Sequence, residues 1–319
     1  MKRKHFVIIS IVIALFMTTF IYIRYINHPP IIKQYRIGAT YMNMNNSFYK
    51  AINDEVKKMV DMRDDILITR DAVMDVDEQV KQINSMIDNK VQVLIINPVD
   101  GTSTKIMEAI SKAKKLGIKI IAVDAQFKDS SLADCTIISD NYGAGKLCAK
   151  HMMKKLDHSK ILLIEHKGAL SAEDRIRGFL DEIKNDDHYK VVARVDSQGA
   201  TEKAMPKVSD VIKEKVNFDV VMALNDPSAL GALAAMDKAR IARRVLVFGV
   251  DGSPDMKRLI KTSGEVEATA AQSPISMGSK AVKAAYDLID KKHVKSKIGV
   301  PIYLITNENI SKYDVSGWQ

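Results

Sequence analysis

The chain has 319 residues, of which 46% are hydrophobic and 27% charged, so the composition excludes a disordered chain and supplies apolar residues for more than one core. The net charge of +9 raises the question of nucleic-acid binding. The lysines are spread along alternating segments, without a helix-turn-helix pattern or an aromatic cluster, so we expect a solvated basic surface and no nucleic-acid partner.

The N-terminal segment joins a basic start to an apolar run. Residues 1–5 read MKRKH, and Phe6–Ile23 contain no charge and would form a helix about 27 Å long. The basic start favours the cytoplasmic side and sends the remainder of the chain outward. No small-x-small cleavage pattern and no cysteine for lipid attachment follows, so we expect a cytoplasmic start (1–5), a single-pass anchor in the cell membrane (6–23) and a tether (24–35). The alternative is a signal peptide cleaved at a site that the pattern does not reveal.

From residue 35 onward, apolar runs rich in Ile and Val alternate with stretches of helical spacing. Runs typical of buried strands are residues 35–42, 65–69, 91–97, 118–124, 160–165, 189–196, 218–226, 244–251 and 265–272. Between them, residues 77–90 place their apolar side chains on one helical face, and residues 102–117 have Thr102 as a capping residue and Gly117 as a terminator. This alternation predicts an α/β fold with two doubly wound parallel-sheet lobes.

Several of the apolar runs end in an amide or a carboxylate. These strand-end residues are Asn97, Asp124, Asn225 with Asp226, Asp251 and Gln272. Ligands of open α/β sheets bind at the carboxyl ends of the strands. Amides and carboxylates without a neighbouring nucleophile suit a ligand rich in hydroxyl groups, because each hydroxyl both donates and accepts. A helix cap is the alternative at any single position, as for Asp226 before Pro227.

The sequence offers little support for other chemistry. The histidines lack metal-ligand spacing, and there is no phosphate-binding Gly-rich loop and no Gly-x-Ser-x-Gly turn, so we expect no metal, no cofactor and no catalytic residue. We interpret His151, His158 and His166 as surface or loop residues. Cys135 and Cys148 could pair outside the cytoplasm, but their apolar surroundings favour two buried free thiols.

The order and spacing of several short stretches resemble the type I periplasmic sugar-binding proteins, the family of the ribose- and galactose-binding proteins. Between about Arg36 and Asn309 these stretches are NNSFYKAI, LIINPVD, IIAVD, ISDNYGAGK, DRIRGF, ALNDPSALGAL, VFGVDGSPD and ATAAQSP. The resemblance implies two Rossmann-like lobes joined by three hinge crossings, near Ser139, Gln272 and Pro301, that close on a ligand. The implied lobes are 36–139 plus 273–301 for the first and 140–272 plus 302–319 for the second.

The resemblance also implies which residues line the cleft. They are Asn46, Phe48, Asn97 and Asp124 from the first lobe, and Asn225, Asp251 and Gln272 from the second lobe and the hinge. Phe48 would be an aromatic platform for the apolar face of a sugar ring, with plain core packing as the alternative. Tyr49 and Arg175 are further candidates.

The sequence departs from the ribose-type pattern where that pattern carries arginines. Ala125 follows Asp124, Thr201 stands in DSQGATEKA, and Val250 stands where an aromatic residue often precedes the Asp-Gly pair. Arg175 lies in a charged segment whose register the sequence does not fix. Fewer arginines mean weaker fixing of hydroxyl groups, so ribose itself is a doubtful ligand.

The resemblance implies an extracytoplasmic, membrane-anchored protein that binds a monosaccharide-like ligand. Its partner would be the permease of an ABC importer or a membrane histidine kinase. A receptor for a non-sugar signal and a repressor-like regulatory core are alternatives on the same fold, although an apolar helix stands where a repressor would carry its DNA-binding headpiece. No paired acid and base is visible, so we do not expect an enzyme.

Overall fold

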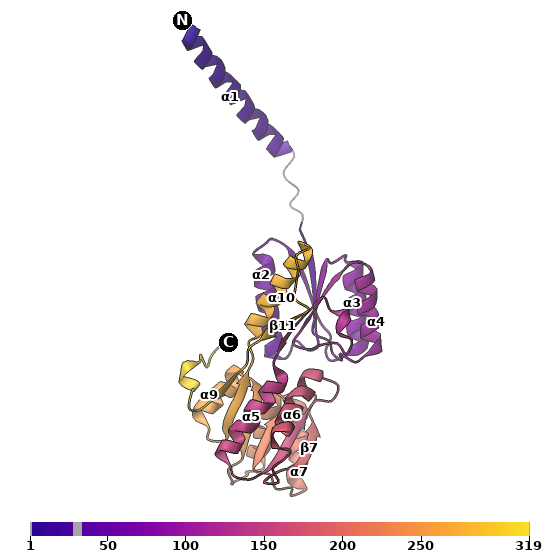
Figure 1. Ribbon diagram of the computed structural model, residues 1–319, viewed down its shortest axis with the longest axis vertical. Coiled ribbons are helices and arrows are strands. Elements are labelled where there is room, and N and C mark those ends of the chain that lie inside the picture. The colour runs from indigo at the N-terminus through magenta and orange to yellow at the C-terminus, as the bar shows by residue number, and fades with distance from the viewer. Residues whose placement is uncertain (1, 28–33, 319) are drawn as a thin grey trace. The chain divides into compact units, whose positions relative to one another are not determined.

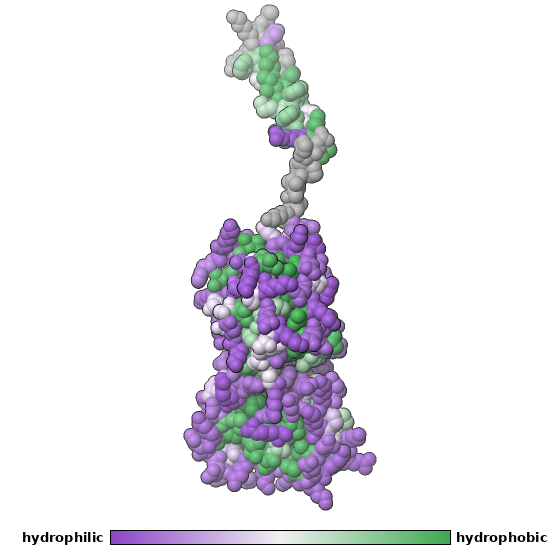
Figure 2. Space-filling view, turned by 90° about the vertical axis from the view of Figure 1, so that its right-hand side faces the viewer, coloured by the Kyte–Doolittle hydropathy of each residue, from purple (hydrophilic) through white to green (hydrophobic). Residues whose placement is uncertain are grey.

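The computed structural model describes residues 2–27 and 34–318, which fall into two units divided between Tyr35 and Arg36 (Figure 1). The first unit contains the helix α1 (Lys2–Asn27). Its stretch His5–Arg24 has a mean hydropathy of 2.7 and is not buried, and Figure 2 shows hydrophobic side chains along it. The helix is long and apolar enough to cross a membrane, and a signal sequence has the same properties.

The second unit contains two six-stranded sheets, ordered β11-β5-β4-β3-β1-β2 and β12-β10-β9-β8-β6-β7. The strands are β1 (Arg36–Tyr41), β2 (Ile66–Asp71), β3 (Val93–Ile96), β4 (Lys119–Val123), β5 (Cys135–Ser139), β6 (Ser159–Glu165), β7 (Tyr189–Asp196), β8 (Val220–Ala223), β9 (Leu246–Asp251), β10 (Val266–Ala271), β11 (Lys297–Val300) and β12 (Tyr303–Thr306). All described neighbours are parallel except β12, which is antiparallel to β10. We call the first sheet with its helices lobe 1 and the second lobe 2.

Helices cover both faces of each sheet because each buries an apolar stripe (Figure 1). The helices of lobe 1 are α2 (Ser47–Asp61), α3 (Val76–Asp88), α4 (Thr104–Lys115) and α10 (Pro274–Ile289). The helices of lobe 2 are α5 (Asn141–Lys155), α6 (Leu170–Ile183), α7 (Thr201–Lys213), α8 (Asp226–Lys238) and α9 (Pro254–Thr262). Two short 3₁₀ turns are η1 (Ser130–Leu132) and η2 (Ile310–Lys312). In lobe 1, α2 packs beside α10 and α3 beside α4; in lobe 2, α5 packs beside α6 and α7 beside α8. The predicted α/β fold with two doubly wound parallel-sheet lobes is confirmed.

The chain passes between the lobes at three places within the described part of the second unit. It leaves lobe 1 between β5 and α5, returns between β10 and α10, and crosses again between β11 and β12. These passages lie at residues 139–141, 271–274 and 300–303, where the resemblance implied a three-crossing hinge. β11 and β12 fall outside the predicted runs because they are partly exposed and lack the continuous apolar run of the buried strands.

One predicted helix start was wrong by one residue. Ser103 caps α4, since its side chain accepts a hydrogen bond from the backbone N–H of Ile106. The hydroxyl and backbone N–H of Thr102 instead donate to Asp100 Oδ1 at 2.7 Å, forming a local turn before the helix. Gly117 lies just beyond the helix with φ +86°, as expected for a terminator.

Candidate ligand-binding site

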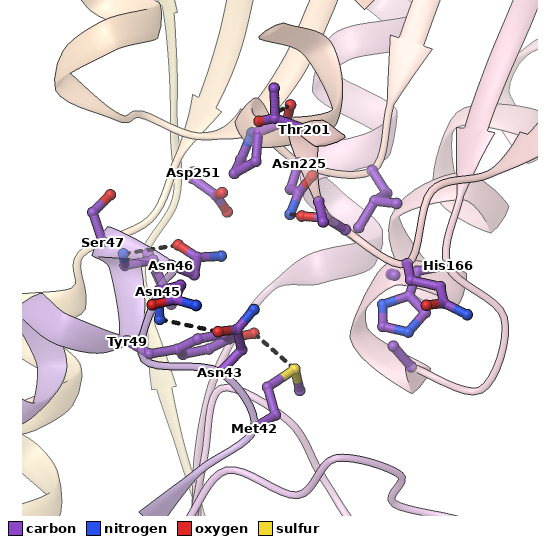
Figure 3. Close-up of a pocket in the computed structure, with 18 of the residues that line it drawn as sticks. Met42, Asn43, Asn45, Asn46, Ser47, Tyr49, His166, Thr201, Asn225 and Asp251 are labelled. Carbon is purple, nitrogen blue, oxygen red and sulfur yellow. Dashed lines mark hydrogen bonds between the residues drawn. The ribbon is translucent and has the colours of Figure 1, made fainter. Parts of the chain in front are cut away.

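A cavity of about 410 Å³ lies between the two lobes at the carboxyl ends of their strands. In Figure 3, Asn43, Asn45 and Asn46 of lobe 1 face Thr201 and Asn225 of lobe 2 across this space. The volume falls in the range of pockets that hold small molecules. The cavity is therefore placed where an open α/β sheet binds its ligand.

Two buried carboxylates from opposite lobes line the cavity. Asp124 follows β4 and is 3% exposed, and Asp251 ends β9 and is 4% exposed. Their φ angles are +64° and +140°, values that residues other than glycine seldom adopt. Such a backbone costs on the order of 1–3 kcal/mol and is found most often at functional sites. Both strand ends are thus turned so that a carboxylate borders the cavity.

Arg175 of α6 lies between these carboxylates. Its Nη1 is 3.6 Å from Asp251 Oδ1 and its Nη2 is 4.0 Å from Asp124 Oδ1. The guanidinium is fixed from lobe 2, because Nε donates to Asn141 Oδ1 at 2.8 Å and Nη1 donates to the carbonyl of Leu224 at 3.0 Å. Of the charged residues in SAEDRIRGF, the structure therefore selects Arg175 for the centre of the site.

Burial is the main cause of the raised pKa of both carboxyl groups. It raises the pKa of Asp124, although the Arg175 guanidinium and the Tyr49 hydroxyl act to lower it. Burial also raises the pKa of Asp251 well above its usual range; Arg175 opposes this increase, while Asp226 and Asp124 add to it. The single guanidinium does not offset the desolvation of the carboxylates.

Two acceptor atoms in the cavity wall have unused hydrogen-bonding capacity. Within residues 2–27 and 34–318, Asp124 Oδ1 and Gln272 Oε1 are among the buried side-chain atoms without a hydrogen-bond partner. The amide nitrogen of Gln272 is used, since it donates to Asp251 Oδ1 at 2.9 Å. Buried polar atoms in folded proteins almost always have partners. A ligand that brings O–H or N–H donors to this wall would supply them.

Asn46 and Asn225 line the cavity and also cap helices. Asn46 Oδ1 accepts from the N–H of Phe48 at 2.9 Å at the start of α2. Asn225 Oδ1 accepts from the N–H of Ser228 at 3.0 Å, and its Nδ2 donates to the carbonyl of Gly199 at 3.0 Å. Asn225, and not Asp226, is therefore the cap of α8.

Asp226 has a different role from the one considered at the sequence level. It is fully buried and accepts from the N–H of Ser253 and the hydroxyl of Thr269, both at 2.7 Å. Its carboxylate therefore joins the start of α8 to the start of α9 and to β10.

Asn97 is not among the residues that line the cavity. Its Oδ1 accepts from the N–H of Met42 at 3.3 Å and its Nδ2 donates to the carbonyl of Val123 at 3.1 Å. The side chain is fully buried and satisfies backbone groups at the ends of β1 and β4. The structure thus uses this amide to hold neighbouring strands together.

Phe48 and Tyr49, at the start of α2, supply the aromatic part of the wall. The Phe48 ring meets Tyr49 and Trp318 edge-on, with ring centroids 5.7 and 5.5 Å apart. The Tyr49 hydroxyl donates to Met42 Sδ at 3.4 Å (Figure 3). Burial raises the pKa of Tyr49 well above its usual value, so this hydroxyl stays protonated.

The interpretation of His151 as a surface or loop residue was wrong, whereas His166 lies in the loop after β6, as expected. His166 lines the cavity, and burial lowers its pKa. It directly follows β6, so the strand-end argument applied to the other site residues could have found it. His151 is buried in α5, where its Nε2 lies 2.8 Å from Glu267 Oε1. His158 is exposed, as expected.

No group of three His, Cys, Asp or Glu side chains in the described ranges could hold a metal ion. Cys135 and Cys148 are both free and buried, and burial raises the pKa of Cys148 to about 12.

Asp124→Asn is expected to raise the free energy of unfolding of the ligand-free protein at pH 7 by about 1–2 kcal/mol. This is the cost of burying a charged acceptor oxygen that has no hydrogen-bond donor. The folded-state pKa of Asp124 lies above the ordinary value of 3.8. The folded state therefore holds this proton more tightly, so stability falls as pH rises through the folded pKa. Urea titrations at pH 5 and pH 7 should show that the stability of Asp124→Asn falls less between these two pH values than the stability of the wild type.

The exposed Asp237 of α8 offers a control, because Asp237→Asn should change neither stability nor its pH dependence. A lower stability of Asp124→Asn at pH 7 would show that the carboxylate is stabilising and would contradict the prediction.

Comparison with known proteins agrees with this geometry. Residues 37–293 match the periplasmic binding protein domain. The ribose import binding protein RbsB of Bacillus subtilis is 28% identical over 278 residues, which are 86% of this chain and 88% of that protein.

Two solved structures share both fold and sequence similarity with the chain. An ABC transporter solute binding protein from Bacillus halodurans C-125, with bound myo-inositol, is 25% identical with a TM-score of 0.83, over 89% of this chain and 98% of that one. An ABC transporter solute binding protein from Mycobacterium smegmatis, with bound glycerol, is 26% identical with a TM-score of 0.84, over 90% of this chain and 98% of that one. The chain belongs to the periplasmic binding protein family.

Proposed function

We propose that the protein binds a small polyhydroxylated ligand, a sugar or a cyclitol, between its lobes as the solute-binding component of an ABC transporter. The observation that carries the proposal is the pair of unsatisfied acceptors, Asp124 Oδ1 and Gln272 Oε1, in the wall of the cavity. Hydroxyl groups would donate to these atoms and accept from the guanidinium of Arg175. The names and bound molecules of its relatives, ribose, myo-inositol and glycerol, support a polyol.

The aromatic wall favours a ligand with one apolar face. Phe48 and Tyr49 border the cavity opposite polar residues such as Asn225. The CH groups of a sugar ring pack against aromatic rings, while its hydroxyls point outward to polar partners. Since the relatives are binding proteins, they support a binding role over an enzymatic one.

Calorimetric titration of the detergent-solubilised full chain tests the proposal. The panel contains ribose, allose, galactose, myo-inositol and glycerol, with amino acids to represent non-sugar signals. At least one polyol should bind, and Asp251→Ala should weaken its binding by about 1.5–3 kcal/mol, as for a hydrogen bond to a charged group. The matched control is Asp237→Ala, at an exposed position of the same lobe.

One result would overturn this function, and another would revise the site. Binding of amino acids, with no response to any polyol, would favour the non-sugar receptor. An unchanged affinity in Asp251→Ala would remove this carboxylate from the site.

We further propose that α1 is an uncleaved anchor that holds the lobes outside the cytoplasm, next to a permease or a membrane histidine kinase. Its apolar stretch His5–Arg24 and the absence of a cleavage pattern after it support this topology. N-terminal sequencing of the protein extracted from membranes should return the basic start. A chain that begins after about residue 24 and is released into the medium would identify a signal peptide instead.

A further inference from the structure

The C-terminal tail, residues 310–318, follows β12 and packs on lobe 2. Ile310 belongs to the buried core on the α7–α8 side of the second sheet, and Tyr313 and Val315 pack against the same core. The tail is therefore an ordered part of lobe 2 as far as these residues.

Lys257 of α9 holds the next part of the tail. Its side chain is fully buried, and its Nζ donates to the carbonyl of Asp314 and to the carbonyl of Gly317, the latter at 2.6 Å. Burial lowers the pKa of Lys257, while Asp314 and Asp226 act to raise it. A buried ammonium is costly unless its donors are satisfied, so these two carbonyls and Lys257 stabilise one another.

Trp318 extends from this anchored segment to the other lobe. Its ring lies 5.5 Å from the ring of Phe48, with an interplanar angle of 76°. Phe48 belongs to α2 of lobe 1 and lines the ligand cavity. The tail thus links the lobes in addition to the three hinge passages, and it does so directly behind a wall of the cavity.

We propose that the C-terminal tail contributes to the ligand site by positioning one of its walls. Trp318 is a positioning residue that holds the Phe48 ring in the cavity wall, and Lys257 fixes the segment that carries Trp318. The Phe48 ring meets two aromatic rings edge-on, those of Tyr49 and Trp318, and such contacts stabilise a ring position beyond the burial of its surface. The tail is fixed on lobe 2 and Phe48 lies on lobe 1. The position of the Phe48 ring in the cavity wall therefore depends on how closely the two lobes approach each other.

This inference rests on the proposed function only for its effect on binding, so a ligand-free measurement comes first. In Trp318→Ala, amide hydrogen exchange of residues 46–52 should become faster, while exchange in β8 and β9 should not change. Trp318→Phe should restore most of the protection, since it keeps an aromatic ring. Trp318 is the only tryptophan in the sequence, so its emission in Lys257→Met should shift to longer wavelength as the ring becomes exposed to water.

Titration with ribose and myo-inositol then measures the effect on binding. Trp318→Ala and Lys257→Met should each weaken the binding of whichever polyol binds by about two- to tenfold, the range of one aromatic contact. Trp318→Ala should do so without a matching loss of thermal stability, whereas Lys257→Met should also lower thermal stability, because it leaves two carbonyls without their donor. Lys261→Met is the control, because Lys261 is an exposed lysine on the same helix.

The outcomes separate the two proposals. If no polyol of the panel binds but exchange at residues 46–52 responds, the polyol function fails and the positioning role of Trp318 stands. Unchanged exchange in Trp318→Ala, or equal effects of Lys257→Met and Lys261→Met, would overturn the role of the tail.

Discussion

Arg175→Met is expected to abolish ligand binding and to lower the free energy of unfolding at pH 7 by about 3–5 kcal/mol, because it leaves buried carboxylates without their counter-charge. The guanidinium is 3.6 Å from Asp251 and 4.0 Å from Asp124, and all three side chains are buried. Loss of the cation should raise the pKa of both carboxyls further. Stability of the variant should therefore recover as the pH falls from 7 to 5, because protonation removes the uncompensated charge.

The same helix offers a matched control. Arg177 is exposed and pairs with Asp174 at 2.7 Å, so Arg177→Met should change stability by less than about 0.5 kcal/mol. Denaturant titrations of both variants at pH 5 and pH 7 measure these effects. Adding Asp251→Asn to Arg175→Met should recover part of the stability but none of the binding. Equal stabilities of the two arginine variants would show that the carboxylates do not need a counter-charge.

The strand-end residues show what the sequence can and cannot predict. Buried parallel strands are apolar on both faces, so a carboxylate at the end of one of them, such as Asp124 or Asp251, stands out in the sequence. An amide at the same kind of position is ambiguous, because its oxygen and nitrogen can satisfy backbone groups. Asn97 does so inside lobe 1, whereas Asn225 caps a helix and still borders the cavity.

Arg175 and Trp318 show why other parts of the site could not be predicted. Three charged residues stand together at the start of α6, and only the packing of this helix against α5 decides which of them turns inward. No side-chain cap fixes the phase of α6, since the residue before it is Ala169. Trp318 meets Phe48 only because the tail, fixed on lobe 2, reaches the start of α2 in lobe 1, and no local sequence pattern predicts this contact.

Gly145→Ala is expected to lower the free energy of unfolding of lobe 2 by about 3 kcal/mol or more, and to weaken ligand binding as well. A Cβ at Gly145 of α5 would overlap the backbone carbonyl oxygen of Arg175 and lie 2.7 Å from the backbone nitrogen of Phe179. A Cβ at Gly178 of α6 would in turn overlap the backbone carbonyl oxygen of Tyr142. The two helices therefore touch backbone to backbone, and a methyl group forces them apart together with Arg175.

The sign of this change is informative, because alanine in a helix is normally about 1 kcal/mol more favourable than glycine. A stabilised Gly145→Ala would mean that α5 and α6 do not touch as closely as the structure places them. Gly264→Ala is the control, since its Cβ would meet no atom within 4 Å, and it should leave both unfolding and binding unchanged. Unfolding monitored by circular dichroism, with polyol titration of the same samples, measures both effects. If Gly145→Ala is destabilised but binds with unchanged affinity, the spacing of α5 and α6 matters for the stability of lobe 2 but does not determine where Arg175 lies in the site.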